Sequence, residues 1–94
     1  MVLFIVTDKT GRKVRLTQRQ WSHICEHPEM TGELERIQET LERPEAVLTS
    51  PRDPQVHYYF RHYKQKAKYL LIAVKYLNGD GFIITTFYSS KMDL

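Results

Sequence analysis

A strong β-hairpin signal near the C-terminal end constrains the fold of this chain most. Residues 69–77 are nearly all apolar or aromatic, and residues 82–88 form a second run rich in β-branched and aromatic side chains. The residues between them, Asn78-Gly79-Asp80-Gly81, favour a tight chain reversal. The pattern predicts an antiparallel strand pair in a sheet that needs helices to cover one of its faces.

The register of this hairpin decides which side chains share a face. With a four-residue loop over 78–81, Leu77 lies opposite Phe82 and Val74 lies opposite Thr85. Side chains alternate between the two faces along each strand. The helix-covered face then contains Leu70, Ile72, Val74, Ile83, Thr85 and Phe87. The other face groups a cation with two hydroxyl groups, those of Lys75, Thr86 and Tyr88.

Two short helices are predicted in the N-terminal half. Thr17 and Gln20 fit a capping box, which starts a helix over residues 18–26. Pro28 disfavours helical geometry at the preceding residue and ends this helix, and it can open the next one. The second helix closes at Pro44. Its apolar face consists of Met30, Leu34, Ile37 and Leu41.

Strands are predicted on both sides of the helices. Residues 2–6 and 13–16 form a hairpin around the turn residues 8–11, and further strands are expected over residues 46–48 and 56–63. The element order is a hairpin, two helices and an antiparallel meander. This order predicts a single α+β domain over residues 1–94.

Composition excludes several classes of protein. The single cysteine, Cys25, rules out a disulfide framework. No apolar run approaches the ~20 residues needed to cross a bilayer, and the first residues lack the basic leader of a signal peptide. We therefore expect a cytoplasmic protein with no membrane partner, either a monomer or a homodimer.

Basic and acidic residues are segregated along the chain. Residues 9–19 and residues 57–76 each contain five Lys or Arg and no Asp or Glu, whereas seven of the 11 acidic residues lie between positions 26 and 45. A basic face attracts the phosphates of a nucleic acid. The same charges also suit solvated strands that resist aggregation. Both interpretations stay open.

The second basic segment interleaves cations with aromatic side chains. Aromatic rings can stack on unpaired bases while cations follow the backbone of a single strand. The candidate nucleic-acid-binding residues are Arg61, Lys64, Lys66 and Lys68. The alternative is an amphipathic strand whose aromatic residues are core and whose basic residues face solvent.

Two histidines, His23 and His27, have the spacing of metal ligands on one helical face. The string His23-Ile24-Cys25-Glu26-His27 also matches an inverted zinc-protease pattern. We expect no metal site, because Pro28 breaks the helix at the second histidine and no partner motif follows. The imidazoles are then either surface and capping residues or a general acid and base.

The predicted group of Lys75, Thr86 and Tyr88 is a second candidate site. A fixed cation beside hydroxyl groups can hold a phosphate and stabilise the charge that develops as its ester breaks. The competing interpretation, which residue types alone favour, is an ordinary amphipathic strand face with a snorkelling lysine.

Six strings spread over nearly the whole chain form a recognisable pattern. They are Leu16-Thr17 through Trp21-Ser22-His23-Ile24, Glu26-His27-Pro28-Glu29-Met30, Ile37 with Thr40-Leu41 ahead of Arg43-Pro44-Glu45, Tyr58-Tyr59-Phe60, residues 69–75 and residues 81–88. Together they resemble the small phage and bacterial nuclease-like proteins of the barnase–EndoU–colicin–RelE superfamily. The resemblance implies N-terminal helices packed on a four-stranded antiparallel sheet.

The resemblance also implies RNA cleavage that needs neither metal nor cofactor. A base activates the ribose 2′-hydroxyl, an acid protonates the leaving 5′-oxygen, and a cation stabilises the phosphorane. Carried over to this chain, it makes His23 and His27 candidates for the acid and base roles. Lys75 becomes the candidate phosphate cation, with Arg61 as its substitute. Thr86 and Tyr88 become candidates to position the phosphate.

Three functions compete at this point. The first is a small ribonuclease with a toxin-like or processing role, whose partners are RNA and an inhibitor protein. The second is a non-catalytic RNA- or protein-binding module on the same scaffold, and the third is a metal hydrolase that uses His23 and His27. The first requires the imidazoles to meet Lys75 and Thr86, although the helix that carries His23 should cover the opposite face of the sheet. A sheet edge or a strong curl would have to bring them together.

Overall fold

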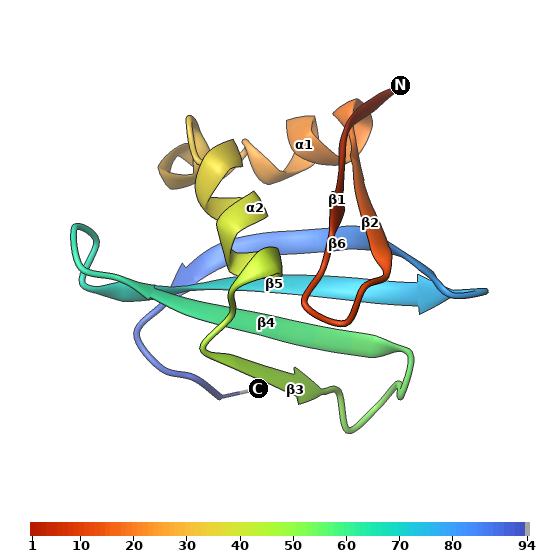
Figure 1. The fold of residues 1–94 in the computed structure, drawn as a ribbon. Coiled ribbons are helices and arrows are strands. Elements are labelled where there is room, and N and C mark those ends of the chain that lie inside the picture. The colour runs from red at the N-terminus through yellow and green to blue at the C-terminus, as the bar shows by residue number, and fades with distance from the viewer. Residues whose placement is uncertain (94) are drawn as a thin grey trace.

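A single sheet is the frame of the molecule (Figure 1). The computed structural model describes residues 1–93, and within them the sheet has six strands in the order β1-β2-β6-β5-β4-β3. Neighbouring strands are antiparallel except β2 and β6, which are parallel. The strands are β1 (Val2–Thr7), β2 (Lys13–Thr17), β3 (Ala46–Thr49), β4 (Val56–Tyr63), β5 (Lys68–Leu77) and β6 (Asp80–Ser89).

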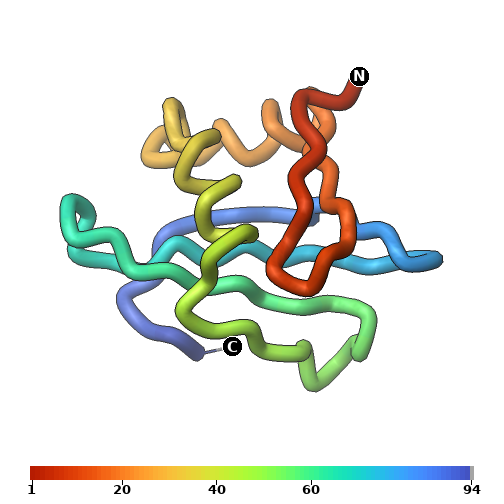
Figure 2. The backbone as a smooth tube through the Cα atoms, viewed as in Figure 1, coloured from red at the N-terminus to blue at the C-terminus, as the bar shows by residue number. Residues whose placement is uncertain are grey.

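The helices lie together on one side of this sheet (Figures 1 and 2). They are α1 (Gln18–Ile24), the 3₁₀ turn η1 (Pro28–Met30) and α2 (Leu34–Glu42). This arrangement confirms the predicted α+β class. The sheet is larger than the four strands that the resemblance implies, because the N-terminal hairpin joins it through the parallel contact between β2 and β6.

Local signals explain where the helices begin and end. The side chain of Thr17 accepts a hydrogen bond from the backbone N–H of Gln20 at 3.1 Å, as the capping motif predicts. Pro28 occupies the first position of η1, where its missing N–H costs nothing. Gly32 then adopts a φ of +81°, which interrupts the helical path. The predicted second helix is therefore two elements, and α2 begins at Leu34.

The core fills the space between the helices and the sheet. The helical side contributes Ile24, Met30, Ile37 and Leu41, all at most 1% exposed. The sheet contributes Tyr59, Leu70, Ile72, Val74 and Ile83. A smaller apolar cluster around Phe60, Leu71 and Ala73 lies on the opposite face.

Neither α1 nor α2 has the length and apolar character of a membrane-crossing helix, and the same is true of η1, within residues 1–93.

The register of the β5–β6 hairpin differs from the prediction in two ways. The turn has two residues, Asn78 and Gly79, with φ of 55° and 87°, so Leu77 lies opposite Asp80 and not opposite Phe82. A bulge follows between Ala73 and Val74. A two-residue turn suits the twist of the paired strands, which is why Asn-Gly alone closes the hairpin.

The bulge moves Thr86 and Tyr88 to the other face of the sheet. Thr86 lies opposite Ile72 and Tyr88 lies opposite Leu70, whose side chains are in the core beneath the helices. Lys75 lies opposite Phe82, before the bulge, and keeps its place on the uncovered face. The predicted neighbours Lys75, Thr86 and Tyr88 are therefore divided between the two faces.

Candidate active site

A carboxylate, a phenol and two cations meet where η1, α2, the β4–β5 turn and the end of β6 come together. We call Glu33, Arg36, Lys66 and Tyr88 the Glu33 cluster. The Tyr88 hydroxyl donates to Glu33 Oε2 at 2.5 Å, and Arg36 Nη1 lies 3.3 Å from the same oxygen. Lys66 Nζ lies 3.8 Å from Glu33 Oε1 and 5.7 Å from the centre of the Tyr88 ring. Glu33 is only 7% exposed.

Each member of the Glu33 cluster reaches this position for a local reason. The turn at Gly32 places Glu33 directly before α2, and Arg36 follows one helical turn later on the same side. The β4–β5 turn bends back at Ala67, which has a φ of 53°, and presents Lys66 to the carboxylate. The bulge in β5–β6 turns Tyr88 inward from β6.

The contacts within the cluster shift the pKa values of Tyr88 and Arg36. Burial, followed by the hydrogen bond to Glu33, raises the pKa of Tyr88 to about 12, so the phenol holds its proton at neutral pH. The hydrogen bond to the Tyr88 oxygen raises the pKa of Arg36. Burial lowers this pKa, but the charge of Glu33 raises it further, so Arg36 stays a cation. A protonated phenol and a carboxylate thus share a short hydrogen bond beside two fixed positive charges.

An open groove lies beside the cluster along α2. It has a volume of about 540 Å³ and shares Arg36 with the cluster. Tyr63 lines it and donates to Glu39 Oε1 at 2.7 Å. Arg43 and Arg61 flank the same carboxylate, with nitrogen atoms 3.5 and 3.6 Å from its oxygens. The charged lining of the groove therefore combines two cations with three acids, which are Arg36, Arg43, Glu35, Glu39 and Glu42.

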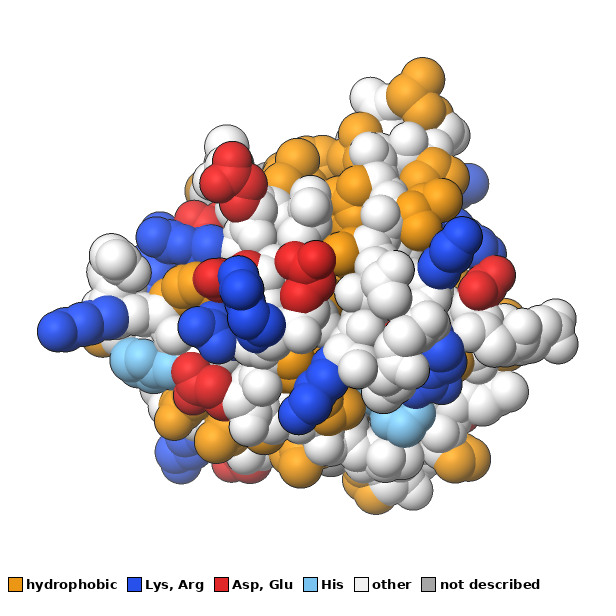
Figure 3. Space-filling view, viewed as in Figure 1, with side chains coloured by type: hydrophobic (Ala, Val, Ile, Leu, Met, Phe, Trp, Pro, Cys, Tyr) orange, Lys and Arg blue, Asp and Glu red, His pale blue; other side chains and the backbone are white. Residues whose placement is uncertain are grey.

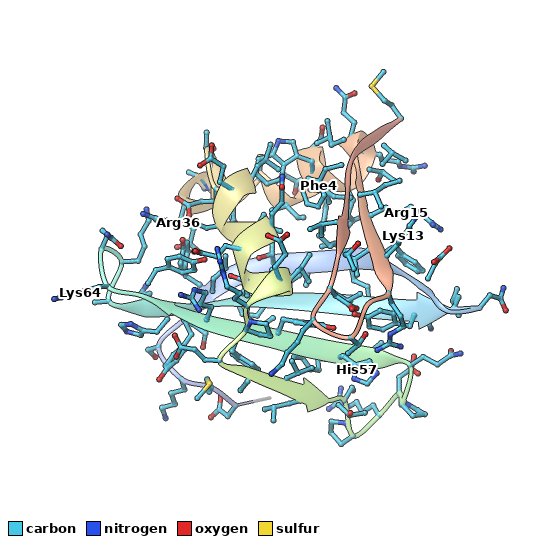
Figure 4. All side chains as sticks on the ribbon, viewed as in Figure 1. Phe4, Lys13, Arg15, Arg36, His57 and Lys64 are labelled. Carbon is cyan, nitrogen blue, oxygen red and sulfur yellow. The ribbon has the colours of Figure 1, made fainter. Side chains whose placement is uncertain are left out.

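The predicted nucleic-acid-binding residues lie largely at this end of the molecule. Arg61 Nη1 donates to the backbone oxygen of Arg43 at 2.8 Å, and Lys66 belongs to the Glu33 cluster. Lys64 and Lys68 are exposed at the two sides of the β4–β5 turn. Figure 4 shows Lys64 at the tip of this turn, and Figure 3 shows basic and acidic side chains side by side on the adjoining surface.

The two histidines lie on the exposed side of the helical layer. His23 Nδ1 is 3.7 Å from Glu26 Oε2, and both side chains are well exposed. His27 is exposed and precedes η1, which packs against β6. No hydrogen bond or ion pair among residues 1–93 connects either imidazole to the Glu33 cluster.

Lys75 and Thr86 do not form a site together. The Lys75 ammonium lies 3.0 Å from Asp53 Oδ2 on the uncovered face of the sheet. Thr86 is fully buried and its hydroxyl donates to the backbone oxygen of Leu71 at 2.8 Å. The prediction that Thr86 and Lys75 face a common phosphate is wrong for this arrangement, because the bulge places them on opposite faces. Of the predicted group, Tyr88 contacts both a carboxylate, that of Glu33, and a cation, that of Lys66.

Sequence reasoning missed Glu33, Arg36 and the role of Lys66. Glu33 and Arg36 have the pattern of a solvated helix face, and the contacts of Glu33 with Tyr88 and Lys66 span 55 and 33 positions. The one local signal is Gly32, whose positive φ directs Glu33 inward.

Within residues 1–93 no group of three or more His, Cys, Asp or Glu side chains is placed to hold a metal ion.

A second buried polar cluster fixes the N-terminal hairpin to the sheet. Asp8 accepts hydrogen bonds from the hydroxyls of Tyr59 at 3.1 Å and Tyr76 at 2.5 Å, and these hydroxyls lie 2.6 Å apart. The Arg12 guanidinium lies 3.7 Å above the Tyr76 ring, and the His57 ring meets the same ring edge-on at 5.3 Å. Because Asp8 belongs to the β1–β2 turn while Tyr59 and Tyr76 belong to β4 and β5, this cluster holds the hairpin on the sheet.

Comparison with known proteins identifies the family of this chain. A search of curated proteins and of solved structures found no match. The family model PBECR2, described as phage-Barnase-EndoU-ColicinE5/D-RelE like nuclease 2, matches residues 3–94 and so covers nearly the whole chain. The match supports a nuclease function in general. The chain belongs to the PBECR2 family of nucleases.

Proposed function

We propose that this protein is a metal-independent endoribonuclease whose reaction takes place at the Glu33 cluster. Family membership supports nuclease activity in general. One observation supports this location: a carboxylate and a protonated phenol share a 2.5 Å hydrogen bond within 3.3–3.8 Å of two cations. These are the groups that cleavage by an internal 2′-hydroxyl requires.

Each group has one role in the proposed reaction. Glu33 takes the proton of the ribose 2′-hydroxyl, whose oxygen then forms a bond to phosphorus. Arg36 and Lys66 stabilise the negative charge that grows on the phosphorane oxygens. Tyr88 gives its proton to the 5′-oxygen as the bond between phosphorus and that oxygen breaks. The products are a 2′,3′-cyclic phosphate and a free 5′-hydroxyl.

The hydrogen bond between Tyr88 and Glu33 would complete the proton cycle. After one turnover, Glu33 carries the proton of the 2′-hydroxyl and Tyr88 is left as a phenolate, and the two oxygens lie 2.5 Å apart. Transfer back along this bond restores both groups without a metal ion. Burial and the bond to Glu33 raise the pKa of Tyr88 to about 12, so the phenol carries at neutral pH the proton that a general acid gives.

The surrounding charges suit a strand of RNA. Lys64 and Lys68 flank the β4–β5 turn, and Arg61 pairs with Glu39, which lines the groove beside α2. A phosphate backbone that follows these cations passes Lys66 and Arg36. His23 and His27 stay candidates for an additional acid or base, because they lie on the segment that leads into η1 and Glu33.

Cleavage of end-labelled RNA in the presence of EDTA tests this proposal. We expect cleavage that persists in EDTA and leaves a 2′,3′-cyclic phosphate, and no cleavage when the 2′-hydroxyl at the cut is replaced by hydrogen. Tyr88→Phe and Glu33→Gln should each reduce the rate about 10²–10⁴-fold, the usual contribution of a general acid or base. Tyr69→Phe and the exposed Glu29→Gln are matched controls of the same chemical change outside the cluster.

Melting curves of every variant separate chemistry from folding, because Tyr88 and Glu33 also connect β6 to α2. A folded Tyr88→Phe or Glu33→Gln variant with full activity would refute the assignment. Loss of activity in His23→Ala or His27→Ala instead would move the acid–base role to the imidazoles. Cleavage that stops in EDTA and returns with zinc would support a metal hydrolase, and salt-sensitive RNA binding without cleavage would support a binding module.

A further inference from the structure

The β1 strand is an edge of the sheet, and some of its backbone groups point away from β2. Helix α2 packs against β1, and Lys9 N, just beyond the strand, donates to Leu41 O of that helix at 3.1 Å. Asp8 N donates to Arg12 O at 2.8 Å, so these residues form a hydrogen-bonded pair of the β1–β2 ladder. Pairs alternate in an antiparallel ladder, and Val6–Val14 is therefore the next bonded pair. The N–H and C=O groups of Ile5, opposite Arg15, consequently point away from β2. The same argument applies to Thr7, opposite Lys13.

The side chains along this edge are apolar and exposed. Ile5 is 61% exposed and Leu3 is 37% exposed, and Val2 and Met1 continue the surface toward the N-terminus. Figure 3 shows hydrophobic atoms gathered over this part of the molecule. Contiguous exposed apolar surface on a small domain is typical of an interaction site.

Few of the usual protections against edge pairing occur in β1. It contains no charged residue and no proline, and its single bulge, between Val2 and Phe4, leaves the stretch from Phe4 to Thr7 regular. The opposite edge, β3, has only four residues and is bounded by Pro44 and Pro51. The two edges of the sheet are therefore not equivalent, and β1 is the one open to a further strand.

Positive charge lies beside the apolar edge. Arg15 and Lys13 share the exposed face of the hairpin with Ile5 and Thr7, and Figure 4 shows both cations projecting outward from β2. Lys9, in the turn between β1 and β2, and Arg19, in the first turn of α1, are also exposed. No ion pair within residues 1–93 engages any of these four side chains.

We propose that β1 binds an extended, acidic segment of a partner protein, which adds to the sheet as a further strand. Backbone pairing would satisfy the outward N–H and C=O groups, and acidic side chains would meet Arg15 and Lys13. Aliphatic side chains such as Ile5 and Leu3 offer no ring on which a nucleobase stacks, so the edge suits protein better than RNA. Pairing of β1 with β1 of a second copy would place like charges on one face.

A labelled ten-residue peptide of alternating Ile and Glu is the probe. We expect it to bind the wild-type protein with an affinity that falls as salt rises, and to slow amide hydrogen exchange at Ile5 and Thr7 at least tenfold. The same peptide N-methylated at alternate residues should bind at least tenfold more weakly, because it cannot complete the backbone ladder. An alternating Ile and Lys peptide should not bind.

Two substitutions of Ile5 test whether the backbone of β1 binds the peptide. Ile5→Pro removes the outward N–H without removing a bond to β2 and should weaken peptide binding at least tenfold, whereas Ile5→Val should not. The N-methylated peptide gives the same test on the unaltered protein. Equal binding of the N-methylated peptide, or protection at β3 in place of β1, would overturn the proposal. Displacement of the peptide by single-stranded RNA, or a wild-type dimer that Ile5→Pro dissolves, would also overturn it.

Discussion

Replacing Asp8 with asparagine tests how the N-terminal hairpin is held on the sheet. Oδ1 of Asp8 accepts three bonds from its own turn, from Thr10 N, Thr10 Oγ1 and Arg12 N. Oδ2 accepts from the buried hydroxyls of Tyr59 and Tyr76. Asparagine has nearly the same shape and keeps one oxygen for the turn. Its NH₂ group, however, faces two hydroxyls that had donated to a carboxylate.

The expected loss of stability follows from these contacts. Each hydrogen bond to a charged group contributes about 1.5–3 kcal/mol. The hydroxyls of Tyr59 and Tyr76 lie 2.6 Å apart and recover part of this by bonding each other and accepting from the amide. We therefore expect Asp8→Asn to lower the free energy of unfolding by about 2–4 kcal/mol, a large part of the roughly 5–15 kcal/mol of a typical domain.

Urea unfolding at several pH values measures this difference and its origin. Burial alone would raise the pKa of Asp8, but the bonds from Thr10, Tyr76 and Arg12 outweigh it and lower the pKa below 3.8. An acid with a lowered pKa stabilises the folded state above its unfolded pKa and loses that effect as pH falls through the folded value. The gap between wild type and Asp8→Asn should thus be constant near pH 7 and shrink below about pH 4.

The exposed Asp80→Asn variant is the control for removing one negative charge. It should change the free energy of unfolding by less than about 0.5 kcal/mol, as is usual for exposed positions. A loss below about 1 kcal/mol for Asp8→Asn, or a gap that stays the same to pH 3, would refute the assignment of the charged acceptor as the anchor.

Two further predictions concern the sheet beneath the hairpin. Gly81→Ala should lower the free energy of unfolding by about 1–3 kcal/mol, because its Cβ would lie 2.7 Å from Tyr76 Cε1 and 2.9 Å from Val74 Cγ1; urea unfolding measures this, and an unchanged stability would contradict it. Burial and the nearby Arg12 hold the pKa of His57 below 6.5, so an NMR titration of Arg12→Gln should move that pKa upward, and a pKa that stays in place would count against the contact.

Elements governed by neighbouring residues could be predicted from the sequence. Thr17 caps α1, Pro28 opens η1, and the pair Asn78-Gly79 reverses the chain between β5 and β6. Each of these signals acts within four residues, so one sequence contains the whole cause. The α+β class followed from their order.

The predicted register of the β5–β6 hairpin was wrong because a glycine can serve either a turn or close packing. Gly81 was interpreted as part of the turn, whereas the turn needs only Asn78 and Gly79. Gly81 is glycine because the side chains of Tyr76 and Val74 occupy the space where a Cβ would be. That requirement comes from packing across the hairpin, and the local sequence looks the same in both cases.

The bulge between Ala73 and Val74 has the larger consequence for the site. An extra residue in one strand reverses the facing of every side chain beyond it, so Thr86 and Tyr88 turn inward while Lys75 does not. The Glu33 cluster depends on this reversal and on contacts between residues far apart in sequence. A pattern analysis that assumes regular alternation cannot find such a site.

The same bulge limits where a nuclease reaction can occur on this scaffold. A phosphate cannot contact Lys75 and Tyr88 together, because the sheet lies between them and Lys75 is held by Asp53. Base, acid and cation must therefore come from one face. On the helix-covered face, the Glu33 cluster brings a carboxylate, a phenol and two cations into contact beside an open groove. The proposed chemistry therefore lies at the β4–β5 turn, apart from the edge strand β1 to which we assign a partner protein.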